Sequence, residues 1–141
     1  MEQFVLSSPE VLQLRAAHAQ PSTEYHIGWD VTFATDIGLV VESVSYWSVI
    51  GTLHVGDATG WGDISVGALL AVHGDPPDDV ERALRDSEAL ETLYDIARNH
   101  LRPLLSTIDS DASLPRKSPD ATVERYEDSD DDDTATQDVE E

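Results

Sequence analysis

The 141-residue sequence contains no cysteine, which excludes disulfide bonds, thiolate metal sites and catalysis by a thiol. Basic residues are also scarce. Eight Lys and Arg stand against 29 Asp and Glu, and the formal net charge is −21. Phosphate repels a chain with this charge, so we expect no binding to nucleic acid. A partner with a basic surface suits the charge better, whether another protein or one that normally holds DNA.

Long hydrophobic runs are missing as well. No stretch of the sequence approaches the roughly 18 apolar residues that are needed to span a bilayer. Residues 1–15 lack the basic segment and sustained apolar run that are typical of a signal peptide. We therefore expect no membrane insertion and a cytoplasmic location.

The acidic residues are unevenly distributed. Residues 109–141 hold 13 acidic and three basic residues, whereas residues 1–108 hold 16 and five. The C-terminal segment has too few large apolar side chains to offset the entropy of ordering it. It also contains an uninterrupted run of like charge, formed by Asp130, Asp131, Asp132 and Asp133. We predict one domain over residues 1–108 and an acidic, disordered tail over residues 109–141.

Three segments have the composition and alternation of β-strands. In residues 24–33 every second residue is large and apolar, which predicts a strand with one buried face and one solvent-exposed face. Residues 39–55 are rich in β-branched and aromatic residues, and their apolar parity changes near Tyr46 and Trp47, which indicates a bulge. The third segment is residues 64–72.

Short connections between these segments predict a meander. Residues 34–38 have the composition of a turn, and residues 56–63 form a loop with three glycines. The N-terminal residues 11–14 fit either an edge strand or a short helix, and we favour the strand.

The apolar spacing becomes helical after the proline pair at 76–77. Ser87 is a suitable N-cap, and one apolar stripe runs from Leu90 to Ile108. Pro103 is expected to end or kink this helix. The predicted fold is α+β, with an antiparallel meander sheet of three to four strands and a long C-terminal helix packed on one face.

The order of these elements resembles the SecB-like family of protein-export chaperones. The resemblance is strongest over residues 64–115. Within them, residues 94–99 (YDIARN) are similar to the aromatic "YARE" core of the family's helix, and Leu114-Pro115 is similar to its Leu-Pro-Pro segment.

The resemblance implies a holdase, which keeps unfolded or nascent chains from aggregating without ATP. Such proteins assemble as homo-oligomers (dimers or tetramers), bind clients in apolar grooves and present an acidic face to a basic partner. The resemblance therefore implies a basic partner such as a translocase or an antitoxin-like protein. Some relatives serve toxin–antitoxin systems instead of protein export.

Aromatic side chains supply the candidate client surface. Tyr46 and Trp47 are adjacent in a strand and point to opposite faces, whereas one helix covers only one face. With β-branched neighbours such as Ile50, an uncovered aromatic makes an apolar interface patch. Packing in the core or between subunits explains the same residues equally well. The candidates are Tyr25, Val44, Tyr46, Trp47, Val49 and Trp61.

Three of the five histidines, His26, His54 and His73, lie in or beside predicted strands, where they could converge with Asp30 or Asp63. No HxH or HExxH spacing is present, so scattered surface histidines are the favoured interpretation. We expect no metal and no cofactor.

A hydrolase triad could be drawn from Ser65, His73 and Asp75, but no nucleophile elbow positions the serine. We expect no enzyme activity.

The acidic tail has three interpretations. Asp130–Asp133 could dock a basic partner protein, or only keep the protein soluble. Alternatively, the protein is an acidic inhibitor that mimics nucleic acid, such as one encoded by a phage, and occupies a basic groove.

Overall fold

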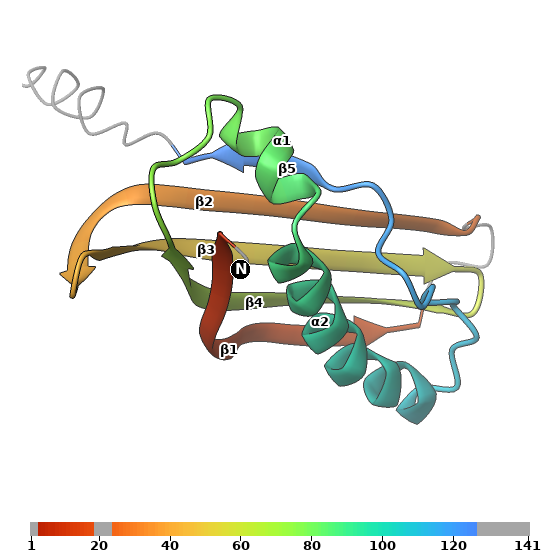
Figure 1. Ribbon diagram of the computed structural model, residues 1–141. Coiled ribbons are helices and arrows are strands. Elements are labelled where there is room, and N and C mark those ends of the chain that lie inside the picture. The colour runs from red at the N-terminus through yellow and green to blue at the C-terminus, as the bar shows by residue number, and fades with distance from the viewer. Residues whose placement is uncertain (1–2, 19–23, 127–141) are drawn as a thin grey trace, which may run out of the picture.

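The computed structural model describes residues 3–18 and 24–126. Five strands form one sheet in the order β1-β4-β3-β2-β5, and the helix α2 crosses one face of it (Figure 1). The strands are β1 (Phe4–Ala17), β2 (His26–Val41), β3 (Val44–Asp57), β4 (Gly60–Val72) and β5 (Thr122–Arg125). The helices are α1 (Val80–Arg85) and α2 (Glu88–Thr107).

The α+β class and the long helix on one face are confirmed. The sheet is larger than predicted, and it is mixed, because β5 pairs in parallel with β2. The favoured N-terminal strand is present as β1, which pairs antiparallel with β4 at one edge. It bends sharply in Figure 1, and its register with β4 shifts between Ser7 and Glu10, where Pro9 lies.

The hairpin between β2 and β3 turns later than predicted. Its turn residues are Glu42 and Ser43, whose φ angles of 51° and 69° suit a two-residue hairpin turn. Residues 34–38, predicted as the turn, lie inside β2, where the register between Ala34 and Leu39 is irregular. The bulge expected near Tyr46 is therefore wrong, because residues 39–41 belong to β2 and β3 keeps one parity throughout.

The glycine-containing loop between β3 and β4 is a tight turn of two residues, Ala58 and Thr59. The backbone N–H of Thr59 donates to the Asp57 carboxylate at 2.7 Å, and its hydroxyl donates to the same oxygen. These hydrogen bonds are the main cause that lowers the pKa of Asp57.

Helix α2 forms as its sequence predicts. The Ser87 hydroxyl caps it by accepting from the N–H of Leu90 at 3.3 Å. Pro103 does not end the helix, which continues to Thr107. One stripe of the helix is buried on the sheet, comprising Ala89, Leu90, Leu93, Tyr94, Ala97, Leu101 and Leu105.

A glycine of β3 lies where α2 packs closely against the sheet. The Trp29 ring lies over Gly51, and a Cβ atom built at Gly51 would be 2.5 Å from Trp29 Cη2 and 2.9 Å from Leu93 Cδ2. The edge of the same indole meets Tyr94, with ring centroids 5.5 Å apart and planes at 75°. Gly51 therefore makes room for the indole between β3 and α2.

Residues 109–126, which the sequence assigned to the tail, belong to the fold up to Tyr126, so the domain boundary predicted at residue 108 is too early. Residues 109–121, here called the strap, run along α2 to β5, with Leu114 buried. Three successive carbonyls of the strap accept hydrogen bonds from side chains of the domain. Their donors are the Tyr25 hydroxyl to Ser113 (2.8 Å), Arg98 Nε to Leu114 (3.2 Å) and the Tyr94 hydroxyl to Pro115 (2.6 Å).

No helix in the described part of the chain is long and apolar enough to cross a membrane.

Substituting Gly51 with alanine tests the packing of Trp29. We expect Gly51→Ala to lower the free energy of unfolding by about 1–3 kcal/mol, because the new methyl group overpacks the indole and Leu93. Urea unfolding measures the change. Gly28→Ala is the matched control, since nothing lies within 4 Å of a Cβ there. Equal effects of the two substitutions would contradict this account.

Removing the Tyr94 hydroxyl tests the strap. Tyr94→Phe leaves the Pro115 carbonyl without its donor, at an expected cost of about 1–2 kcal/mol in urea unfolding. Phe33→Leu is the control. Phe33 is also buried, but its side chain makes none of the hydrogen bonds to the strap.

The same variant predicts a pH dependence. Burial raises the pKa of Tyr94 to about 12, whereas a tyrosine in the unfolded chain titrates near about 10. The contribution of Tyr94 is therefore complete below about pH 10 and is lost as the pH rises towards about 12. We expect wild-type stability to fall more steeply than that of Tyr94→Phe over this range. Parallel curves would contradict the assignment.

Candidate functional site

The face of the sheet opposite α2, here called the outer face, is the candidate site. On β3 the residues that face the helix are buried, among them Val49, Leu53 and Val55, and the alternate residues point to the outer face. In the described part of the chain no helix packs against this face, because the buried residues of both helices join the single core on the other side.

Cross-strand register arranges the outer face in rows. The first row is Val5, Ala71, Tyr46 and Leu39, in the order β1, β4, β3, β2. The next two rows place Leu69 beside Ser48, and Gly67 beside Ile50. These rows form one apolar area, here called the outer apolar patch and defined by Val5, Leu12, Leu39, Tyr46, Ile50 and Leu69.

Several residues of the outer apolar patch are strongly exposed. Val5, Leu39 and Ile50 are 40–42% exposed and Leu12 is 51% exposed, although all lie in strands. Leu12 leans over Gly67, where an added Cβ would meet its Cδ1 at 3.0 Å. Exposed apolar area of this continuity is typical of a binding surface.

A shallow pocket of about 260 Å³ opens beside the patch at the β2 edge. The backbone N–H of Tyr126 donates to the Phe33 carbonyl at 2.7 Å, so this exposed aromatic stands next to the pocket. The lining residues are Thr32, Phe33, Ala34, Ser48, Ile50 and Tyr126.

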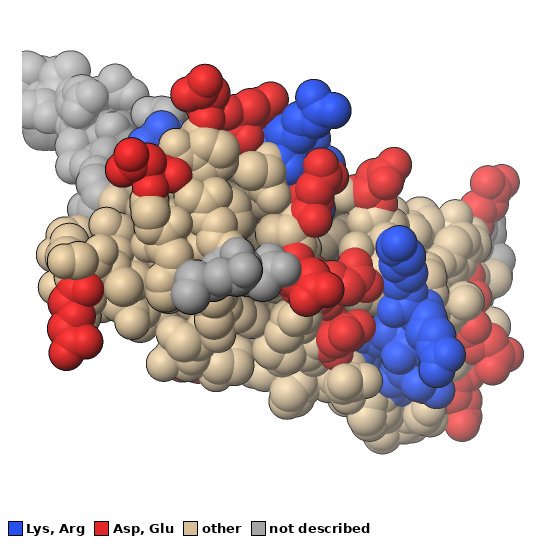
Figure 2. Space-filling model, in the orientation of Figure 1, with Lys and Arg blue, Asp and Glu red and all other residues tan. Residues whose placement is uncertain are grey.

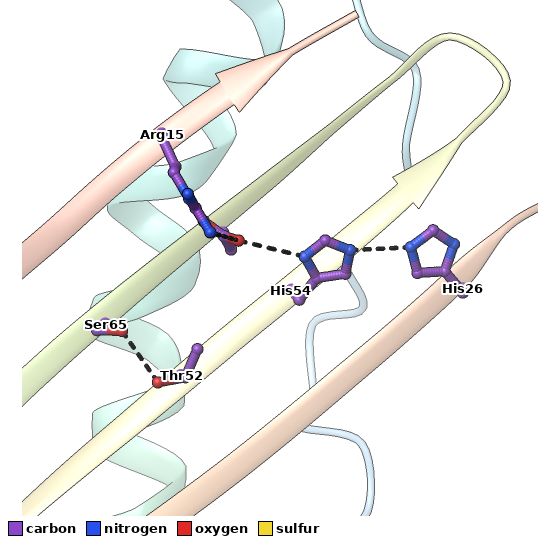
Figure 3. A network of polar contacts seen from close by, with 6 residues as sticks. Arg15, His26, Thr52, His54 and Ser65 are labelled. Atoms are coloured by element: carbon purple, nitrogen blue, oxygen red, sulfur yellow. Dashed lines mark hydrogen bonds and ion pairs between the residues drawn. The ribbon is translucent and has the colours of Figure 1, made fainter. Parts of the chain in front are cut away.

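The other half of the outer face is polar (Figure 3). Arg15 of β1 donates to both carboxylate oxygens of Asp63 on β4, at 2.8 and 3.2 Å. Asp63 lies 3.4 Å from Nδ1 of His54 on β3, and Nε2 of His54 lies 2.9 Å from Nε2 of His26 on β2. Nearby, the hydroxyls of Thr52 and Ser65 pair at 2.9 Å.

Trp61 covers one end of this polar network. The Arg15 guanidinium carbon is 5.5 Å from the centre of the Trp61 ring, and the His54 ring stacks on the indole with centroids 6.0 Å apart. The hydrogen bond and the charge of Asp63 raise the pKa of Arg15, so the guanidinium remains charged.

The structure divides the predicted client residues between the two faces. Tyr46 is on the outer face, and Trp61 lies on it beside the polar network. Trp47 and Val49 are only 5% and 1% exposed, because they face α2 and pack in the core. They therefore cannot contribute to an exposed client surface.

Tyr25 is exposed and is bonded to the strap, while Val44 is half-buried at the β2–β3 hairpin. The acidic docking candidates Asp130–Asp133 lie outside the described residues.

Of the polar clusters considered in the sequence, one is assembled and one is not. His26, His54 and Asp63 come together, as described above. Ser65 and His73 are eight residues apart along an extended chain that rises about 3.3 Å per residue, so they lie roughly 25 Å apart. The Ser65 hydroxyl pairs with Thr52. Ser65 and His73 are therefore too far apart to form the hydrolase triad, for which the sequence also offers no nucleophile elbow.

A larger cleft of about 670 Å³ lies between the start of α2 and the end of the strap. Its walls mix both signs of charge, including Arg85, Glu88, Arg116 and Lys117. Figure 2 shows the same mixture of acidic and basic side chains over the helix-bearing face. Glu91 in this cleft accepts two hydrogen bonds from Ser118, which holds the strap. The hydrogen bonds from Ser118 to Glu91 show that this cleft helps to hold the strap against α2.

Sequence reasoning missed Val5, Leu12, Leu39 and Leu69. A signal for one of them was present, since Leu69-Leu70 puts two large apolar residues in succession in a strand, and one of any such pair must leave the core face. Leu39 was assigned to the same strand as Tyr46, so its pairing with Tyr46 across two strands was not predicted.

Comparisons with known proteins support the fold. No protein-family model matches the chain, and no curated protein does. Among solved structures, the chain is similar to the Mycobacterium tuberculosis Rv1957 SecB-like chaperone in complex with a ChAD peptide from the Rv1956 HigA1 antitoxin. The TM-score is 0.60 at 18% sequence identity, over 82% of this chain and 88% of that chain. The chain therefore has a SecB-like fold.

Proposed function

We propose that this protein is an ATP-independent chaperone or adaptor that binds non-native polypeptide on the outer apolar patch. The observation that carries the proposal is the exposure of aliphatic side chains in paired strands, such as Ile50 at 42%. A sheet face normally buries such residues against a second layer, and an apolar segment of a client would supply that layer. The protein acts by binding, and not as an enzyme.

The shape of the surface favours an extended client. The outer apolar patch crosses four strands in successive rows, and the pocket of about 260 Å³ beside Ile50 suits a single side chain of a client. The net charge of −21 keeps a protein with an exposed patch in solution and attracts clients with basic flanks.

Protein export and toxin–antitoxin control are the two contexts that we propose for this activity. The SecB-like fold supports both, and the antitoxin peptide in the Rv1957 complex favours the second. We also propose a homo-oligomer, because β1 leaves a long strand at one edge of the sheet.

Replacing Ile50 with aspartate tests the outer apolar patch. We expect Ile50→Asp to raise the concentration needed to suppress aggregation of a reduced, unfolded client about tenfold, because the substitution removes apolar contact and adds a charge that must be desolvated. Light scattering of the aggregating client, without nucleotide, measures the effect.

Val40→Asp is the matched control, since Val40 is an aliphatic strand residue that is 63% exposed and lies outside the patch. It should suppress aggregation as well as the wild type. Circular dichroism and multi-angle light scattering verify that both variants keep their fold and assembly. Equal suppression by wild type and Ile50→Asp would sink the proposal.

The rival function is inhibition of a basic, DNA-handling protein through mimicry of nucleic acid, which the run Asp130–Asp133 favours. Replacing all four residues with asparagine in the full chain distinguishes the two functions. A chaperone should keep its suppression of aggregation within about twofold, because the patch is unchanged. A mimic should instead lose salt-sensitive affinity for its basic target. Loss of suppression in this variant would count against the outer apolar patch.

A further inference from the structure

His26 and His54 face each other across neighbouring strands of the outer face (Figure 3). Their Nε2 atoms are 2.9 Å apart, and their rings stack with centroids 4.9 Å apart. The two residues are diagonal neighbours, since His26 pairs with Gly56 and His54 pairs with Gly28. A Cβ at Gly56 would be 2.8 Å from His26 Cε1, so the glycine gives the His26 ring room to reach His54.

The other nitrogen of each ring has an acceptor as its partner. Nδ1 of His26 lies 3.0 Å from the carbonyl oxygen of Glu24, which only accepts hydrogen bonds. Nδ1 of His54 lies 3.4 Å from the Asp63 carboxylate, which also accepts from Arg15. When both Nδ1 atoms donate to these acceptors, both Nε2 atoms present a lone pair.

Without an ion, one ring donates its Nε2 proton to the other ring at 2.9 Å. With an ion present, both Nε2 atoms can offer it a lone pair. We propose that His26 and His54 form a two-histidine binding site for a divalent transition-metal ion of the zinc type, with Asp63 as the positioning group of His54. In metal sites the ligating histidine commonly donates its second N–H to a carboxylate or a backbone carbonyl. This pair has one of each.

Two movements let the pair hold the ion. Two nitrogens bound at about 2.0–2.1 Å to a tetrahedral ion lie roughly 3.3–3.4 Å apart, so the rings must separate by a few tenths of an ångström and turn until their lone pairs converge on the ion. Both side chains are partly or fully exposed, which permits this rotation.

Water completes the coordination. The described residues hold no group of three histidine, cysteine or acidic side chains around one point, so the protein supplies two ligands. The surroundings are negative. Besides Asp63, Asp57 lies near His26, because it follows Gly56, the β3 partner of His26. A bound metal ion would link β2 to β3. Through the contacts of His54 with Asp63 and of Asp63 with Arg15, it would also be connected to β4 and β1.

Zn²⁺ alone, titrated into the metal-free full chain at pH 7.5, tests the proposal by isothermal calorimetry. We expect one equivalent to bind per chain. His26→Gln and His54→Gln should each weaken the binding at least tenfold, and Asp63→Asn should weaken it less. His100→Gln is the matched control, because His100 lies on α2 with its ring bonded to the Ile96 carbonyl. Its affinity should equal that of the wild type.

Two further measurements keep the test independent of variant folding. Zn²⁺ should raise the melting temperature of the wild type, but not that of the double variant His26→Gln, His54→Gln, since only a ligand of the native state stabilises it. Proton competition for the same lone pairs should weaken Zn²⁺ binding when the pH is lowered from 7.5 to 5.5.

Binding that is the same in the wild type and the double variant would show that Zn²⁺ associates with other groups, such as the acidic tail, and would overturn the proposal. No binding at all would also overturn it, and would leave only the hydrogen bond between the two Nε2 atoms.

Discussion

The packing of Trp29 between β3 and α2 is the constraint on which the rest of the structure depends. The indole occupies the space above Gly51, and Leu93 packs beside the same glycine. The indole also makes a T-shaped contact with Tyr94. Tyr94 in turn donates to the strap, which leads to β5. One buried aromatic therefore couples the sheet, the helix and the C-terminal segment, and it sets which face of the sheet the helix covers.

Local signals in the sequence predicted the elements near this core. The period of two in residues 24–33 and the Ser87 cap each act within a few residues, so no tertiary information was needed for the first half of β2 or for α2. The fifth strand could not be found in this way. Thr122–Arg125 has only one buried residue, Val123, and it becomes a strand because the strap delivers it to the free edge of β2.

The neighbours of each aromatic residue on the sheet depended on the position of the β2–β3 turn, which composition does not reveal. With the turn placed at residues 34–38, Val40 appeared to share a strand with Trp47, and the parity seemed to switch. The real turn at Glu42-Ser43 assigns Val40 to β2, and β3 then alternates regularly. The opposite faces of Tyr46 and Trp47 follow from their adjacency, but only the real turn shows that Leu39 lies beside Tyr46 on the candidate site. A site on a sheet is therefore only as predictable as the register of the sheet.

The same register explains how one face of the sheet holds two kinds of surface. Rows near the β2–β3 turn join aliphatic residues of four strands, whereas the rows near the β3–β4 turn join Arg15, Asp63 and His54. Neither half is a sequence motif, since Ile50 and Val5 are far apart in the chain, as are His26 and His54. In the function that we propose, the apolar half exchanges a client without disturbing the core on the other side. A polar half that ties four strands together keeps the sheet rigid while it does so, because each cross-strand contact restrains the register on which the outer apolar patch depends.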